Sequence, residues 1–244
     1  QDCLRALTTG SANTAVGKEA FKGGSGCTAS SNTAIGYQSL FAGTTGEQNT
    51  AVGANSLAAT TTGSYNTAIG KGALDTNTTG GYNTAVGLRA LQASTTANNN
   101  TALGYWAGFA NTTGAANTFL GRSAGQTQTT QNYNTFVGGN AGQYNESDDN
   151  TAVGRYAMRS TNGSATGATN TAVGRSALEL ISTGNSNTAV GGYSLDANTT
   201  GSNNTAVGTS ALGATTTASD NAAVGVQALF ANTTGASSNA FGYQ

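Results

Sequence analysis

A five-residue motif, Asn-Thr-Ala-Val-Gly, recurs along the whole chain and constrains its fold more than any other feature. It is first complete at Asn13–Gly17, and most successive copies are spaced by 17 residues, as in the unit from Asn66 to Tyr82. The glycines that close the copies are Gly17, Gly36, Gly53, Gly70, Gly87, Gly104, Gly121, Gly138, Gly154, Gly174, Gly191, Gly208, Gly225 and Gly242. A fixed period of this kind indicates a repeat architecture with one structural unit per period.

The repeat unit predicts a β-solenoid. Its consensus, N-T-A-V-G-x-x-A-L-x-x-x-T-T-G-x-x, contains a β-branched segment that ends at glycine and a second apolar pair followed by a turn. Two-helix repeats need about 30 residues or more, so the unit is too short for them. The fold class expected is therefore all-β: a parallel β-solenoid (β-roll) of about 14 coils with a 17-residue repeat. A single domain, 1–244, is expected, with 1–31 as an irregular N-terminal coil that holds two cysteines.

The composition fits a solenoid better than a layered domain. Leu, Ile, Val and Phe together make up roughly 14% of the chain, which is below the range of ordinary compact domains. Disordered chains combine low hydrophobicity with high net charge, but here nine basic residues face ten acidic ones. A narrow solenoid needs few large apolar side chains, and this accounts for the deficit.

Two apolar columns are expected to form core ladders along the stacked coils. The aliphatic column, the residue before each corner glycine, consists of Val16, Ile35, Val52, Ile69, Val86, Leu103, Leu120, Val137, Val153, Val173, Val190, Val207 and Val224. The leucine column, the residue four after that glycine, contains Leu40, Leu57, Leu74, Leu91, Leu178, Leu195, Leu212 and Leu229.

A third column is polar. The asparagine column, which opens each motif, consists of Asn13, Asn32, Asn49, Asn66, Asn83, Asn100, Asn117, Asn134, Asn150, Asn170, Asn187, Asn204 and Asn221. Stacked amides can form a hydrogen-bond ladder that satisfies backbone groups at a corner. The alternative is that asparagine is used only because it tolerates turn conformations.

Exceptions to the motif occur in compensating pairs. Phe119 and Phe136 replace the alanine of the motif, and in the same units Gly125 and Gly142 replace the leucine. Gly108 also replaces a leucine one unit earlier. Because interiors are close-packed, we infer that the alanine and leucine positions project into one shared space of conserved volume.

The motif N-T-A-V-G-x-x-A-L with its T-T-G turn resembles the repeats of trimeric autotransporter adhesin heads. It is still more similar to the N-T-A-[VI]-G-x-x-A-L arrays of surface and phage-fibre proteins that end in an intramolecular chaperone domain. The resemblance covers nearly all of the chain and implies a left-handed β-roll, with three chains side by side in the adhesin heads. The 17-residue coil is longer than the adhesin unit.

The cysteines, Cys3 and Cys27, lie near one end of the chain. An intrachain disulfide that staples this end is the favoured expectation, and an interchain bridge or two free thiols are the alternatives. Four Asn-Thr-Thr sequons lie at the T-T-G turns and would be glycan sites in a eukaryotic source. Their asparagines are Asn77, Asn111, Asn198 and Asn232.

No catalytic, cofactor-binding or metal-binding residue is predicted. The chain has no histidine, which removes the common catalytic triads and histidine metal sites. Glu146, Asp148 and Asp149 share one turn, but the calcium β-roll motif is missing, so a solvated loop is expected. Arg155 and Arg175 occupy the same slot in neighbouring coils and are expected to face water.

The function expected is that of a structural or adhesive extracellular fibre subunit, a non-catalytic rod at the cell surface or in a virion fibre. Its main partner would be itself, side by side as in a trimer or head to tail in a filament, because two apolar columns give a thin core and neither end of the array shows a polar cap. A host or surface receptor is a further expected partner. With 8% charged residues and no apolar run of about 20, neither nucleic-acid binding nor membrane insertion is expected.

Two alternatives to a fibre subunit of this kind are an ice-binding β-solenoid with ordered threonines and a phage tail-fibre shaft that binds a host receptor. Against ice binding, the regular threonine alternates with alanine. A polysaccharide-degrading β-helix would need carboxylates clustered across neighbouring coils. The ten acidic residues are scattered, which disfavours that enzyme.

Overall fold

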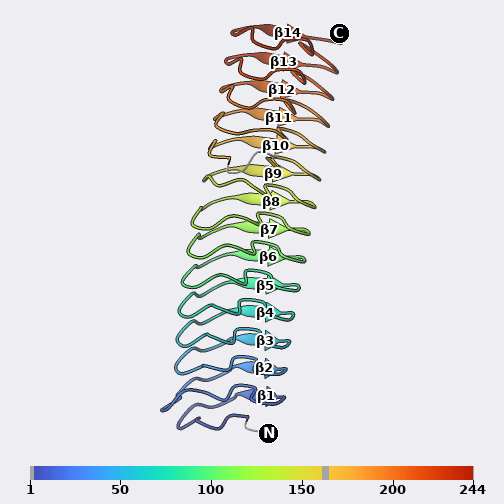
Figure 1. Ribbon diagram of the computed structural model, residues 1–244. Coiled ribbons are helices and arrows are strands. Elements are labelled where there is room, and N and C mark those ends of the chain that lie inside the picture. Colours follow the sequence, from blue (N-terminus) through green and yellow to red (C-terminus); the bar gives the residue numbers. More distant parts are fainter. Residues whose placement is uncertain (1–2, 161–164, 244) are drawn as a thin grey trace. The chain divides into compact units, whose positions relative to one another are not determined.

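The computed structural model describes residues 3–160 and 165–243. In these residues the chain forms fourteen strands of three residues each and no helix, with one strand per coil (Figure 1). The strands are β1 (Thr14–Val16), β2 (Thr33–Ile35), β3 (Thr50–Val52), β4 (Thr67–Ile69), β5 (Thr84–Val86), β6 (Thr101–Leu103), β7 (Thr118–Leu120), β8 (Thr135–Val137), β9 (Thr151–Val153), β10 (Thr171–Val173), β11 (Thr188–Val190), β12 (Thr205–Val207), β13 (Ala222–Val224) and β14 (Asn239–Phe241). The predicted fold class, an all-β parallel solenoid with a repeat of about 17 residues, is confirmed.

The chain divides into two compact units, Gln1–Arg122 and Ser123–Gln244. The first unit contains β1 to β7 and the second β8 to β14, and within each unit the strands pair in parallel in chain order. The sequence shows no linker at the division, so the single domain stays a prediction.

Pairing places like residues on top of one another. Between β4 and β5 the partners are Thr67 with Thr84, Ala68 with Ala85 and Ile69 with Val86. Between β11 and β12 the register is equivalent, threonine on threonine, alanine on alanine and valine on valine. The 17-residue period thus fixes the register of each rung.

The orientation of the strands corrects one prediction. The aliphatic column is not part of the core, because the central residue of each strand, which is alanine except at Phe119 and Phe136, points inward and the residues on either side of it point outward. Ala68 is fully buried, whereas Ile69 is 41% exposed. None of the aliphatic positions in the strands is buried: Val16, Ile35, Val52, Ile69, Val86, Leu103, Leu120, Val137, Val153, Val173, Val190, Val207 and Val224 are all half-exposed or exposed. The two-residue alternation of a strand allows only one of the two sets to face inward, and the narrow interior takes the alanines.

The leucine column does lie in the interior. Seven of its members, from Leu40 to Leu212, are at most 1% exposed, and Leu229 is half-exposed. These leucines adopt the left-handed backbone region, with φ of 51° at Leu74, a conformation that favours glycine. Gly108 (φ 59°) and Gly142 (φ 56°) adopt it in the same slot.

The interior also shows where the phenylalanines lie. Phe119 and Phe136 are fully buried. A Cβ at Gly142 would overlap the ring of Phe136, and a Cβ at Gly108 would overlap the ring of Phe119. In both places a ring fills the space that a leucine side chain would take. Gly125 belongs to the other unit from Phe119, so that pairing stays a prediction.

The asparagine column forms an amide ladder. Asn66 donates from Nδ2 to Oδ1 of Asn49 (3.1 Å) and to the carbonyl of Gly80 (2.8 Å). The backbone N–H of Asn66 also donates to Asn49 Oδ1 (3.0 Å), and Asn83 bonds to Asn66 in the same way. None of the positive-φ residues in the described chain belongs to this column, which argues against the alternative of a simple turn residue.

The predicted disulfide is absent, and both cysteines are free. Cys3 Sγ donates to the carbonyl of Gly17 (2.7 Å), whereas Cys27 is buried and pairs with Leu7 in a parallel bridge. The two thiols therefore occupy different positions around the coil, and the prediction of an intrachain bridge was wrong.

The expected glycan sites are also corrected. Asn77, Asn111 and Asn198 are fully buried, and their Nδ2 atoms donate to the glycine carbonyls that follow in the T-T-G turns. An amide nitrogen engaged in the interior is not accessible to a modifying enzyme, and only Asn232 is half-exposed.

Candidate functional site

The outward surface of the sheet in the first unit is the most distinctive candidate site. We call it the Thr/aliphatic face and define it by the outward residues of β1 to β7. Its threonines are Thr14, Thr33, Thr50, Thr67, Thr84, Thr101 and Thr118, and its aliphatic residues are Val16, Ile35, Val52, Ile69, Val86, Leu103 and Leu120. Every member is partly or fully exposed, with Val16 reaching 57%, and none is charged.

Two stacked tyrosines border this face. Tyr65 and Tyr82 each lie two residues before a strand, and their ring centroids are 4.8 Å apart with planes 7° from parallel. They are 45% and 61% exposed. Large exposed aromatic side chains are enriched in protein interfaces, where they contribute much contact area at little entropic cost.

The size of the face can be estimated from strand spacing. Seven strands at about 4.8 Å by three residues of about 3.3 Å give a footprint of roughly 300 Å². An apolar patch of this size is at the level that marks functional surfaces on monomeric proteins. The face is therefore a candidate for recognition rather than for catalysis, since threonine and aliphatic side chains carry no acid–base groups.

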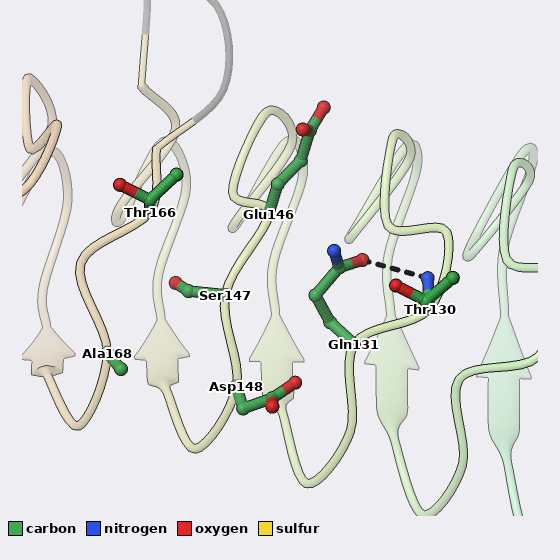
Figure 2. Close-up of a pocket in the computed structure, with 7 residues that line it drawn as sticks. All are labelled: Thr130, Gln131, Glu146, Ser147, Asp148, Thr166 and Ala168. Carbon is green, nitrogen blue, oxygen red and sulfur yellow. Dashed lines mark hydrogen bonds between the residues drawn. The ribbon is translucent and has the colours of Figure 1, made fainter.

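A second candidate is a hollow of about 360 Å³ in the second unit. Figure 2 shows its lining at the turns that precede the strands, with Glu146 and Asp148 from one coil and Thr130 and Gln131 from the coil before. The lining residues are Thr130, Gln131, Glu146, Ser147, Asp148, Thr166 and Ala168.

Two polar side chains of the hollow serve the coil-to-coil hydrogen bonding, and a third stabilises its own turn. Asp148 Oδ1 accepts from the backbone N–H of Asn132 (2.7 Å), and Ser147 Oγ donates to the carbonyl of Gly167 (2.6 Å). Gln131 Oε1 accepts from the backbone N–H of Thr130 (3.0 Å). Serine and asparagine oxygens in other coils accept bonds equivalent to that of Asp148, for example Asn98 from Gly81. The presence of Asp148 is therefore explained by its hydrogen bond to the neighbouring coil.

Metal ligation finds no support in the described part of the chain. Among residues 3–160 and 165–243, no group of three or more His, Cys, Asp and Glu side chains could hold a metal ion. Glu146, Asp148 and Asp149, which share a turn, do not converge into such a group.

The sequence interpretation missed the Thr/aliphatic face because it assigned the aliphatic column to the core. The strict Thr-Ala-Val alternation was the available signal, since alternate residues of a strand share a side. With alanine inward, threonine and valine must both face outward.

No family model, no curated protein and no solved structure matches the chain. Within the residues that the structure describes, no helix has the length and hydropathy needed to cross a membrane.

Proposed function

We propose that this protein is a non-catalytic structural and adhesive subunit of an extracellular fibre at the cell surface or on a virion, and that its solenoids associate side by side. The observation that carries the proposal is the Thr/aliphatic face of the first unit, which is exposed, uncharged and continuous over β1 to β7.

A second copy of the chain is the partner that fits this face best. Its outward side chains repeat at every coil, about 4.8 Å apart, and a surface with the same rise matches that spacing at each rung. No charge has to be desolvated when two such faces meet, because both outward columns are uncharged.

The energy available suggests why assembly would involve several chains. Burial of roughly 300 Å² of apolar surface on each partner, at about 25 cal/mol per Å², supplies about 15 kcal/mol as an upper estimate. Association costs about 4–15 kcal/mol in lost freedom. One face therefore gives weak to moderate pairing, which additional neighbours in a bundle would reinforce.

The test compares a charge placed on the face with the same charge placed elsewhere. Ile69→Glu puts a carboxylate in the middle of the Thr/aliphatic face, and Thr79→Glu puts one on an exposed T-T-G turn. We expect sedimentation velocity and electron microscopy to show elongated oligomers for the wild type and for Thr79→Glu, and a shift to monomers for Ile69→Glu. Monomeric wild-type protein at all concentrations would refute lateral assembly.

A second candidate function, ice binding, is favoured by one specific observation. Alanine points inward, so the threonine column is flanked on the outer surface by the aliphatic column rather than by alanine. This removes the objection raised from the sequence, since threonines and methyl groups form one regular array. Thermal hysteresis of the wild-type protein, measured at concentrations where sedimentation shows monomers, would support ice binding, and its absence there would leave the fibre role alone.

A further inference from the structure

Two arginines in adjacent coils of the second unit present unpaired charge. Arg155 and Arg175 each follow a corner glycine, and both are exposed. The backbone N–H of Ser176 donates to the carbonyl of Arg155 (3.0 Å), which places the two arginines in consecutive rungs, about 4.8 Å apart. Among the described residues, neither forms a salt bridge. Like charges this close are unfavourable unless an anion approaches them.

A tyrosine accompanies each arginine. Arg155 Cζ lies 4.4 Å from the ring centroid of Tyr156, and its Nη2 donates to the Tyr156 hydroxyl (2.8 Å). Arg175 Cζ lies 5.3 Å from the ring centroid of Tyr193 in the next coil. The hydrogen bond and the charge of Arg155 lower the pKa of Tyr156. The guanidinium groups are thus held beside aromatic rings at defined positions.

A neighbouring ion pair also contacts Tyr156. Arg159 Cζ lies 4.5 Å from the Tyr156 ring centroid, and Arg159 Nη2 is 2.7 Å from a carboxylate oxygen of Glu179. Glu179 is therefore engaged with Arg159, and the charges of Arg155 and Arg175 are left for a ligand.

The slots on both sides of the arginine pair are empty of side chains. Gly139 precedes Arg155 in this column, and Gly192 follows Arg175. A Cβ at Gly139 would meet no atom within 4 Å, and at Gly192 the nearest atom would be the Arg175 carbonyl oxygen at 3.9 Å. A ligand can therefore approach both guanidinium groups along the solenoid axis.

We propose that Arg155, Tyr156, Arg175 and Tyr193 form a binding site for an acidic polysaccharide. The guanidinium groups bind its carboxylate or sulfate groups in a bidentate manner, Tyr156 holds Arg155 in position, and the exposed Tyr193 packs against the C–H surface of a sugar ring. A nucleic acid is a poorer fit, because its affinity depends on many phosphate contacts and this site offers two unpaired cations. The inference rests on the adhesive part of the proposed function and is independent of lateral assembly.

Binding is measured on the full chain with immobilised polygalacturonate and dextran sulfate at low ionic strength, with neutral dextran as the blank. The variants are Arg155→Gln and Arg175→Gln, with Tyr193→Ala to test the aromatic contact. Lys71→Gln is the matched control, because Lys71 is an exposed cation in the same slot of a coil in the first unit. We expect each arginine variant to bind about tenfold more weakly and Tyr193→Ala several-fold more weakly, with Lys71→Gln unchanged.

Several outcomes would overturn the site. The first is that the wild-type protein binds neither acidic polysaccharide, and the second is that Lys71→Gln weakens polysaccharide binding as much as the arginine variants do. The site would also be overturned if a single-stranded oligonucleotide bound as tightly as the polysaccharides, or if inorganic phosphate at the same charge concentration fully displaced them. Circular dichroism checks that the variants are folded. Retained binding in monomeric Ile69→Glu would support the site even when assembly fails, and assembly without binding would reject the site but keep the fibre role.

Discussion

Truncation of two aliphatic residues in one coil tests which column forms the core. Leu74 is fully buried, and Ile69, five residues earlier, is 41% exposed. Leu74→Ala should leave a cavity and cost about 2–5 kcal/mol of unfolding free energy. Ile69→Ala removes three carbon groups worth about 0.8 kcal/mol each when fully buried, and the exposed fraction reduces the expected loss to about 1–1.5 kcal/mol.

Urea unfolding followed by far-UV circular dichroism measures both losses. Both variants lie in one coil, so they report on the same cooperative segment even when a repeat array unfolds in steps. The protein is kept dilute, because Ile69 also lies on the proposed association face. Ile69→Val, which removes a single carbon, should be close to neutral. A loss for Ile69→Ala equal to or greater than that for Leu74→Ala would refute the assignment of the aliphatic column to the surface.

Four further outcomes are expected. Gly70→Ala should destabilise the chain by about 3 kcal/mol or more in urea, because φ is +132° there and the new Cβ would meet the backbone of the next coil. Asn83→Ala should cost about 2–4 kcal/mol in the same assay, since it leaves buried hydrogen-bonding groups of two neighbouring coils unpaired. Burial raises the pKa of Asp196, so this group favours folding below its ordinary value of 3.8 and loses that contribution as the pH rises through the folded-state pKa. Asp196→Asn should therefore raise the unfolding free energy at pH 7 by less than about 1 kcal/mol, given the solvent screening of a half-buried group, and should have no effect near pH 3. A thiol reagent should label Cys3 in the folded protein and Cys27 only after denaturation, as mass spectrometry of the labelled peptides would show.

The solenoid and its register could be predicted because they depend on the period alone. A 17-residue unit with a corner glycine stacks identical residues in successive coils. The amides of the asparagine column are then close enough to form hydrogen bonds with one another. The leucine column could be assigned to the interior because a leucine side chain has no polar group that would favour contact with water. The sequence also predicted that each phenylalanine compensates for the volume of a missing leucine. The structure agrees at one pair, because the Phe136 ring lies where a Cβ at Gly142 would be.

The orientation of the strand could not be read from hydrophobicity. Valine outranks alanine on every scale of burial tendency, yet the interior takes Ala68 and leaves Ile69 outside. In this coil the interior already holds Leu74, which is buried with a left-handed φ of 51°. The space that remains beneath the strand is filled by the methyl group of Ala68.

The same geometry connects the fold to the proposed function. In most coils the interior consists of a small residue, a leucine and the hydrogen-bonded asparagine, and none of these contacts requires an aliphatic side chain on the outer surface. Threonine or serine at those outward positions would meet the needs of a soluble solenoid and avoid an exposed apolar patch. The outward aliphatic residue is nevertheless present in all seven strands of the first unit. We propose that its regular occurrence reflects binding on the outside of the solenoid, since a surface that repeats at every coil is best matched by another solenoid with the same rise.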